Sequence, residues 1–289
     1  MRTAVFGAEG MLGRDLLEVL GPDGVGLGHA DADIADADAV ARALDRAAPE
    51  AVVLAAAFHD VPRCEREPEP AFRVNAVGAL NVARAAAARG LKLLFVGTDY
   101  VFSGEKGAPY VEDDLPAPVN VYGVAKLAAE HATLEAHPGA IVARTCGLYG
   151  VHPCRAKKGH HIVEFILGRL ERGEPLKMVA DEFACPTSTI SLARQIVALL
   201  ERGGAGIYHA VNGPGGSWYD FARAAARAAG LPGEAIEKAS AATFPSPVRK
   251  PRDSRLACAR LAAEGLLVLD STEAALAEHV ARRRAARSR

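Results

Sequence analysis

The sequence is poor in cysteine and aromatic residues, and its charges nearly cancel. Its five cysteines are odd in number and never form a C-x-x-C pair, so neither a disulfide framework nor a zinc site is predicted. A formal net charge of −1 gives no basis for a nucleic-acid partner. Apolar runs are too short for a membrane span, and no secretory leader precedes the first strand-like run. We therefore expect a cytoplasmic chain that binds neither nucleic acid nor membrane.

The first half of the 289-residue chain alternates short apolar runs with segments of helical length. Such runs are typical of strands buried on both faces of a parallel sheet. The expected strands are residues 2–8, 24–28, 51–57, 92–97 and 140–144, and the expected helices are residues 11–20, 37–48, 70–89 and 121–137. Asp36 and Asn120 are expected to cap two of these helices. The alternation predicts an α/β fold, a Rossmann-like doubly wound parallel sheet, as an NAD(P)-binding domain over residues 1–150.

Beyond residue 150 the alternation weakens into segments interrupted by glycine and proline, with expected helices at 188–202 and 218–229. We expect residues 151–289 to form a smaller C-terminal substrate-binding lobe, interleaved in space with the first domain. Residues 151–161 are expected to form a loop over the substrate side. The adjacent His160 and His161 lack a third ligand at metal-binding spacing, so no metal site is predicted. The arginine-rich tail from Ala281 predicts a solvated, frayed helix end.

Three glycines stand where the first expected strand gives way to the first helix. Gly7, Gly10 and Gly13 form a G-x-x-G-x-x-G pattern. Glycines at this point allow a tight turn and let backbone N–H groups approach a pyrophosphate, which the positive end of the helix also attracts. The pattern in this context predicts a dinucleotide cofactor.

The segment after the second expected strand leaves the choice between NADH and NADPH open. An acidic group near the adenosine ribose favours NADH, and a basic group favours NADPH. His29 and Asp31 in this segment point to opposite preferences. Asp33 is explained equally well as a residue near the adenine and as a loop carboxylate.

Tyr122 and Lys126 lie four residues apart on an expected helix, and therefore on the same face. This spacing alone is common among surface pairs. Its chemical interpretation is that the ammonium lowers the pKa of the phenol and makes it a general acid/base. Thr98 follows the expected strand 92–97, where a hydroxyl can bond a substrate carbonyl oxygen. The order of glycine turn, strand-end threonine, tyrosine and lysine favours the catalytic interpretation.

These motifs resemble those of the extended short-chain dehydrogenase/reductases, and most closely the dTDP-4-dehydrorhamnose reductase family. The resemblance covers nearly the whole chain. Besides the glycine motif, it is carried by T-D-Y-V-F from Thr98, V-Y-G-V-A-K from Val121, R-T-C-G-L-Y-G from Arg144, D-E-F-A-C-P-T from Asp181 and S-W-Y-D-F-A from Ser217.

The resemblance implies NADPH- or NADH-dependent reduction of the 4-keto group of a nucleotide-linked 4-keto-6-deoxysugar, with a homodimer left open. It implies that Tyr122 donates the proton, that Lys126 binds the nicotinamide ribose and lowers the Tyr122 pKa, and that Thr98 orients the keto oxygen. The other implied contacts are Gly7, Gly10, Met11, Leu12, Gly13, Asp33, Ile34, Ala55, Ala56 and Ala57 for the cofactor, and Asp99 and Thr187, with Thr98, for the substrate.

The chain departs from the family pattern mainly on the substrate side. Gly147 stands where a tryptophan is common, and Glu182 and Ala184 replace a glutamine and a glycine. Leu54 and His161 each stand where an asparagine is usual.

Two alternatives stay open. One is another nucleotide-sugar enzyme, an epimerase or a dehydratase, although a dehydratase typically carries glutamate where Tyr100 follows Thr98 and Asp99. The other is a non-catalytic, NADP-binding regulatory subunit resembling the β subunit of methionine adenosyltransferase, which can keep the same tyrosine and lysine.

Overall fold

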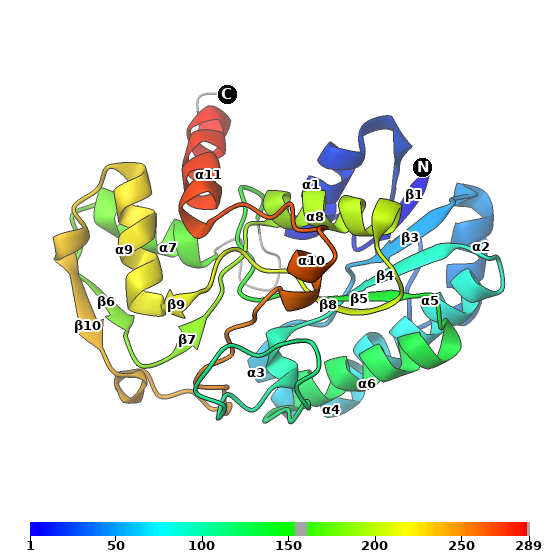
Figure 1. Ribbon diagram of the computed structural model, residues 1–289, viewed down its shortest axis with the longest axis horizontal. Coiled ribbons are helices and arrows are strands. Elements are labelled where there is room, and N and C mark those ends of the chain that lie inside the picture. The colour runs from blue at the N-terminus through cyan, green and yellow to red at the C-terminus, as the bar shows by residue number, and fades with distance from the viewer. Residues whose placement is uncertain (154–160, 288–289) are drawn as a thin grey trace.

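A six-stranded parallel sheet forms the centre of the computed structural model, which describes residues 1–153 and 161–287 (Figure 1). Its strands are β1 (Thr3–Phe6), β2 (Gly24–Leu27), β3 (Ala51–Leu54), β4 (Lys92–Val96), β5 (Ile141–Arg144) and β8 (Gly206–His209). Their spatial order is β2-β1-β3-β4-β5-β8, with every pair parallel. The order reverses between β1 and β3, and α/β proteins bind ligands at such a switch point, beyond the carboxyl ends of the strands.

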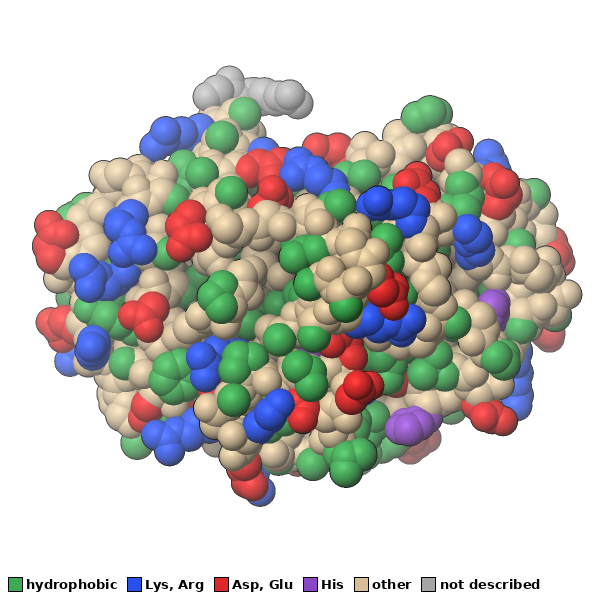
Figure 2. Space-filling view, viewed as in Figure 1, with side chains coloured by type: hydrophobic (Ala, Val, Ile, Leu, Met, Phe, Trp, Pro, Cys, Tyr) green, Lys and Arg blue, Asp and Glu red, His purple; other side chains and the backbone are tan. Residues whose placement is uncertain are grey.

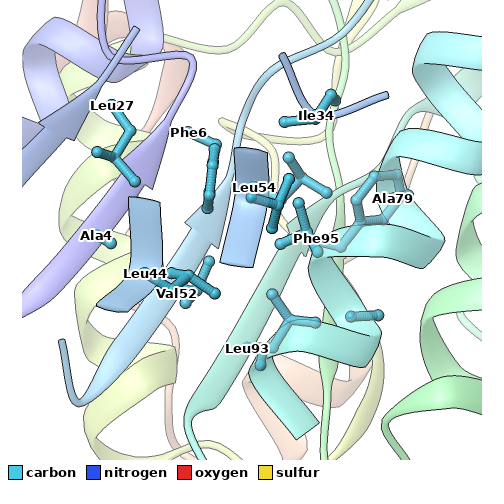
Figure 3. Close-up of a cluster of buried hydrophobic side chains, with 14 of the residues drawn as sticks. Ala4, Phe6, Leu27, Ile34, Leu44, Val52, Leu54, Ala79, Leu93 and Phe95 are labelled. Atoms are coloured by element: carbon cyan, nitrogen blue, oxygen red, sulfur yellow. The ribbon is translucent and has the colours of Figure 1, made fainter. Parts of the chain in front are cut away.

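Helices cover both faces of this sheet (Figure 1). One face carries α1 (Met11–Leu20) and α8 (Thr189–Arg202), and the other carries α2 (Ala37–Ala47), α5 (Gly78–Ala87) and α6 (Val121–Ala136). Figure 3 shows the core under α2 and α5, where Phe6, Leu54 and Phe95 from three adjacent strands meet. Because β1, β3 and β5 are buried on both sides, their sequences are almost entirely apolar, with only Thr3 and Arg144 as polar residues. The α/β prediction is confirmed.

A smaller lobe lies on the left in Figure 1. It contains α7 (Ile162–Glu171), α9 (Trp218–Ala229) and α11 (Thr272–Arg287), the parallel pair β6 (Leu176–Val179) and β10 (Ile236–Ala239), and the antiparallel pair β7 (Phe183–Ala184) and β9 (Gly216–Ser217). Its own core joins Ile166, Phe221 and Leu276. The chain returns to the central sheet through α8 and β8, so segments after residue 150 contribute to both parts.

The helix expected over residues 70–89 is wrong in its details. The structure has α3 (Val61–Arg66), α4 (Pro68–Phe72), a π-helical segment at Arg73–Val77, and then α5. Pro68 starts α4 because proline, which lacks an N–H, fits the first helical position. The π-helical segment positions the Asn75 side chain to hydrogen-bond Phe58, in the loop after β3. The helical periodicity of the sequence gives no sign of this contact.

Short helical segments complete the fold: η1 (Gly21–Asp23), η3 (Asp99–Val101), η5 (Gly233–Ala235), η6 (Ala241–Thr243) and α10 (Ala259–Ala263). The two expected helix caps are confirmed. Asp36 accepts hydrogen bonds from the amides of Asp38 and Ala39, and Asn120 accepts one from the amide of Gly123. Within the described ranges, no helix combines the length and the apolar character needed to cross a membrane.

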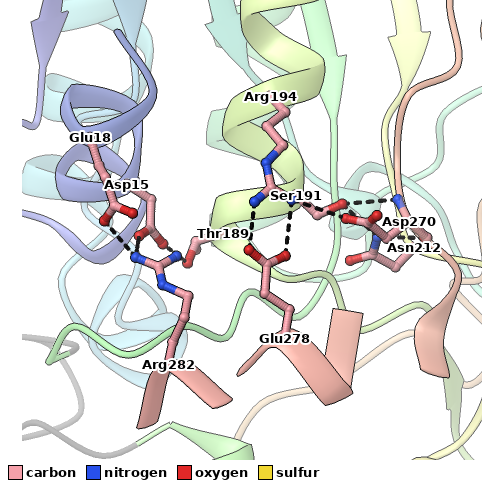
Figure 4. A network of polar contacts seen from close by, with 9 residues as sticks. All are labelled: Asp15, Glu18, Thr189, Ser191, Arg194, Asn212, Asp270, Glu278 and Arg282. Atoms are coloured by element: carbon pink, nitrogen blue, oxygen red, sulfur yellow. Dashed lines mark hydrogen bonds and ion pairs between the residues drawn. The ribbon is translucent and has the colours of Figure 1, made fainter. Parts of the chain in front are cut away.

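The expectation of a frayed C-terminal tail is wrong. Arg283 is nearly buried and forms bidentate ion pairs with Glu164 and Glu171 of α7. Arg282 pairs with Asp15 and Glu18 of α1 (Figure 4). These two arginines therefore connect α11 with α7 in the smaller lobe and with α1 on the central sheet. A run of arginines in the sequence does not predict these partners. On the face shown in Figure 2, cationic and anionic side chains are intermixed, in keeping with the net charge of −1.

Candidate active site

The three glycines after β1 meet three different requirements. Gly7 has a φ of 86°, and a Cβ on it would lie 2.7 Å from the amide nitrogen of Ala56. A Cβ on Gly13 would lie 2.2 Å from the carbonyl oxygen of Gly7. Gly10 has an ordinary φ of −73°. A Cβ added to Gly10 would meet only the carbonyl oxygen of Gly7, at 3.2 Å. Gly7 and Gly13 are thus required for packing, whereas Gly10 keeps the space in front of α1 open.

The N-terminus of α1 provides backbone donors at this open space. The helix begins at Met11, and Gly10 supplies no side-chain cap. The first amides of a helix, here those of Met11, Leu12 and Gly13, have no intrahelical acceptor and carry the positive end of the helix dipole. This arrangement fits a pyrophosphate group.

The loop after β2 holds its acidic side chains in local turns. Asp31 Oδ2 accepts a hydrogen bond of 2.8 Å from the amide of Gly28, and Asp33 Oδ1 accepts one of 2.9 Å from the amide of Ala35. Ile34 between them is buried in the core. One carboxylate oxygen of Asp33 therefore stabilises a local turn, and the contact of Asp33 with the adenosine stays a prediction.

The segment after β3 lies directly beside the glycine turn. Ala55, Ala56 and Ala57 are partly exposed there, and Ala56 touches the Gly7 position. Asn75 fixes the next residue, because its side chain accepts from the amide of Phe58 at 2.9 Å and donates to the Phe58 carbonyl at 3.0 Å. This clamp was missed from the sequence.

Thr98 and Tyr122 come together at the carboxyl end of β4. Thr98 Oγ1 accepts a hydrogen bond from the amide of Tyr100 and lies 3.2 Å from Asp99 Oδ1. The Thr98 hydroxyl also acts on the pKa of the nearby Tyr122 phenol. The rings of Tyr100 and Tyr122 meet edge to face, with centroids 5.8 Å apart. A hydroxyl pair at a strand end, on the same edge of the sheet as the glycine turn, is a suitable site for binding and protonating a carbonyl oxygen.

Lys126 is buried one turn further along α6. Its Nζ donates a 2.7 Å hydrogen bond to the carbonyl of Val96 and lies 3.9 Å from the centroid of the Phe95 ring. Burial lowers the pKa of Lys126 to about 7, and the charge of Glu130 opposes the change. Glu130 is itself buried in a bidentate ion pair with Arg144, which the sequence did not reveal.

The net change in the pKa of Tyr122 is upward. Burial raises this pKa, and the nearby Thr98 hydroxyl opposes only part of the rise. Lys126 Nζ is directed at the Val96 carbonyl, and a lowering of the Tyr122 pKa by Lys126 stays a prediction. Tyr122 is therefore protonated at neutral pH, the state that a proton donor needs.

The expected substrate residues differ in their accessibility. Asp99 is almost completely buried, with Oδ2 accepting a hydrogen bond from Cys146 Sγ at 3.1 Å, and burial raises its pKa. Thr187 has no exposed surface. Its hydroxyl donates to the Cys185 carbonyl at 2.8 Å and accepts from the amide of Asn212. Thr187 therefore stabilises the loop that leads into α8.

In the described part of the chain, two groups place three potential metal ligands within 4.8 Å of one another. They are His161, Glu164 and His279, and Asp15, Glu18 and His152. In each group an arginine already pairs with the carboxylates: Arg283 pairs with Glu164, and Arg282 pairs with Asp15 and Glu18. The guanidinium groups thus supply the positive charge that a metal ion would otherwise provide. His160 and the remainder of the segment 154–160, expected as a loop, lie outside the described residues.

Comparison with known proteins places the chain in a family. The family model described as "RmlD substrate binding domain" matches residues 1–285. The chain is 37% identical to a dTDP-4-dehydrorhamnose reductase of Mycolicibacterium smegmatis, over 97% of this chain and 85% of the relative. It is 34% identical to the Escherichia coli protein of the same name, over 89% of both chains. The crystal structure of dTDP-4-dehydrorhamnose reductase from Bacillus anthracis in complex with NADP superimposes with a TM-score of 0.90 at 31% identity, covering 97% of this chain and 99% of the other. The chain therefore belongs to the RmlD substrate binding domain family, together with these dTDP-4-dehydrorhamnose reductases.

Proposed function

We propose that the chain is an NAD(P)H-dependent oxidoreductase that reduces the 4-keto group of a dTDP-linked 4-keto-6-deoxysugar, as a dTDP-4-dehydrorhamnose reductase does. The observation that carries the proposal is the position of Tyr122. Burial holds the pKa of its phenol above the ordinary value, and the phenol lies near Thr98 at the edge of the sheet that also carries the glycine turn. The names of the similar proteins supply the substrate class.

The cofactor would lie across the switch point between β1 and β3. Gly7, Gly10 and the amides of Met11, Leu12 and Gly13 would hold its pyrophosphate, Asp33 and Ile34 its adenosine, and Ala55, Ala56 and Ala57 its path toward the nicotinamide. When bound, the cofactor supplies the hydride. The Bacillus anthracis relative holds NADP, which supports NADPH, while NADH stays an alternative for this chain.

The side chains would divide the remaining chemistry among them. The Thr98 hydroxyl orients the keto oxygen, and Tyr122 donates its proton to that oxygen as negative charge develops on it. Lys126 would bind the nicotinamide ribose. Proton donation by a positioned acid contributes about a hundred- to ten-thousandfold in rate.

We assign cofactor binding to residues 1–150, supplemented by α8 and β8, and substrate binding to the rest of residues 151–289 together with Thr98 and Asp99. A cytoplasmic location and a homodimer remain predictions for this chain. Size-exclusion chromatography with light scattering measures the oligomeric state directly.

The proposed function is tested by NADPH and NADH consumption, followed at 340 nm, with a panel of dTDP-4-keto-6-deoxysugars. We expect turnover with at least one member and a product whose C4 carbon carries a hydroxyl, identified by mass spectrometry and NMR. A chain that binds NADP⁺ in calorimetry, consumes no reduced cofactor with any member and co-purifies stoichiometrically with another protein would instead be a regulatory subunit.

A further inference from the structure

The chain has a single tryptophan, Trp218, at the first position of α9. Its side chain is partly buried and packs against two hydrophobic clusters, the lobe core around Phe221 and the cluster that contains Cys146 and Cys185. The indole therefore lies where the smaller lobe meets the strand ends of the central sheet. Part of its surface remains exposed at this meeting point.

The indole touches the backbone that follows β5. A Cβ on Gly147 would lie 3.3 Å from Trp218 Cη2 and 3.3 Å from the Cα of Pro186. Gly147 is partly exposed and has a φ of 51°, a conformation that other residues rarely adopt. A glycine here leaves this edge of the indole uncovered by any side chain at position 147.

A chain of contacts leads from the indole to the proposed proton donor. Gly147 follows Cys146, whose Sγ hydrogen-bonds Asp99, and Asp99 in turn lies 3.2 Å from Thr98 Oγ1. Thr98 is in turn close to Tyr122. This series of contacts connects the indole with the proposed proton donor, on the side of the smaller lobe.

We propose that Trp218 is a specificity-determining residue, whose indole packs against the apolar face of the pyranose ring in the hexose part of the substrate site. This inference rests on the proposed function. A deoxyhexose offers C–H groups and a methyl group, and aromatic side chains bind such apolar surfaces in ligand sites. Gly147 supports the arrangement because the indole packs directly against the backbone there.

Because Trp218 is the only tryptophan, its fluorescence on excitation at 295 nm reports on this position alone. The protein with NADP⁺ is titrated with dTDP-rhamnose and, separately, with dTDP. We expect a saturable change in emission with the sugar nucleotide and a much smaller change with dTDP. Equal changes with both ligands, or no change while calorimetry shows the sugar nucleotide binding, would overturn the proposal.

Kinetics of three variants provide the second test. Trp218→Leu should raise KM for the sugar nucleotide about tenfold, with Trp218→Phe in between and KM for NADPH unchanged. Tyr219→Leu is the matched control, because the neighbouring aromatic residue on α9 faces Arg223 and Lys238 instead. Thermal unfolding of each variant separates loss of packing from loss of binding.

The kinetic outcomes distinguish the two proposals. If the wild type turns over a dTDP-4-keto-6-deoxysugar while Trp218→Leu keeps the KM of Tyr219→Leu, the proposed function stands and the role of Trp218 is refuted. If the wild type consumes no reduced cofactor with any sugar in the panel, the proposed function fails, and the inference fails with it.

Discussion

Replacing Lys126 by methionine should abolish activity and at the same time stabilise the fold. Lys126 is 3% exposed, and burial lowers its pKa from 10.5 to about 7. Holding the ammonium in the folded chain therefore opposes folding at neutral pH. At about 1.4 kcal/mol per pH unit, this difference in pKa corresponds to a penalty on the order of 5 kcal/mol.

The hydrogen bond from the ammonium to the Val96 carbonyl offsets part of this penalty. A hydrogen bond from a charged donor, such as the one to Val96, contributes about 1.5–3 kcal/mol. Methionine fills a similar volume without a charge, so the net gain for Lys126→Met at pH 7 is about 2–3 kcal/mol. With an unfolding entropy of about 2.1 cal/mol/K per residue over 289 residues, the melting temperature should rise by about 3–5 °C.

The pH dependence gives this prediction a sign. The folded-state pKa of Lys126 lies below its unfolded value, so the unfolded chain binds more protons between pH 7 and 10.5. The wild type therefore gains stability relative to Lys126→Met as the pH rises through this window. Thermal unfolding of both proteins at pH 7 and pH 10 measures the effect. A variant less stable than the wild type at pH 7, or an advantage equal at both pH values, would refute the reasoning.

Two further substitutions separate packing from binding. Glu130→Gln leaves Arg144 buried without its counter-charge and should lower the free energy of unfolding in urea by about 3–5 kcal/mol, while Glu135→Gln on the exposed side of the same helix should change it little. Gly13→Ala should destabilise the fold by about 1–3 kcal/mol, because its Cβ would lie 2.2 Å from a backbone oxygen. Gly10→Ala should leave stability nearly unchanged and weaken NADP⁺ binding in calorimetry; unchanged affinity would count against the cofactor assignment.

The sequence predicted those features that neighbouring residues determine. The strands of the central sheet are buried on both faces, so their apolar runs stand out, and α1 and α9 begin and end where their patterns indicate. Gly7, Gly10 and Gly13 were found because a strand-to-helix turn is a local structure. Thr98, Tyr122 and Lys126 were found because a parallel sheet places all strand ends on one edge.

Features that depend on distant contacts could not be predicted in the same way. The Glu130–Arg144 ion pair joins α6 to β5, and neither residue differs in type from a surface charge. Trp218 meets Gly147 only because the smaller lobe packs against the strand ends. Arg283 is part of a basic run, and only the position of α7 shows that it is paired. The direction of the Tyr122 pKa depends on its burial, which helical spacing does not specify.

The most direct test of the account is the turnover of Tyr122→Phe with the best dTDP-4-keto-6-deoxysugar and NADPH. The substitution removes only the hydroxyl, so cofactor affinity and melting temperature should stay close to those of the wild type. We expect the turnover number to fall by about two to four orders of magnitude. A Tyr122→Phe protein that keeps near-wild-type turnover would show that the proton comes from another group, and the central claim would be contradicted.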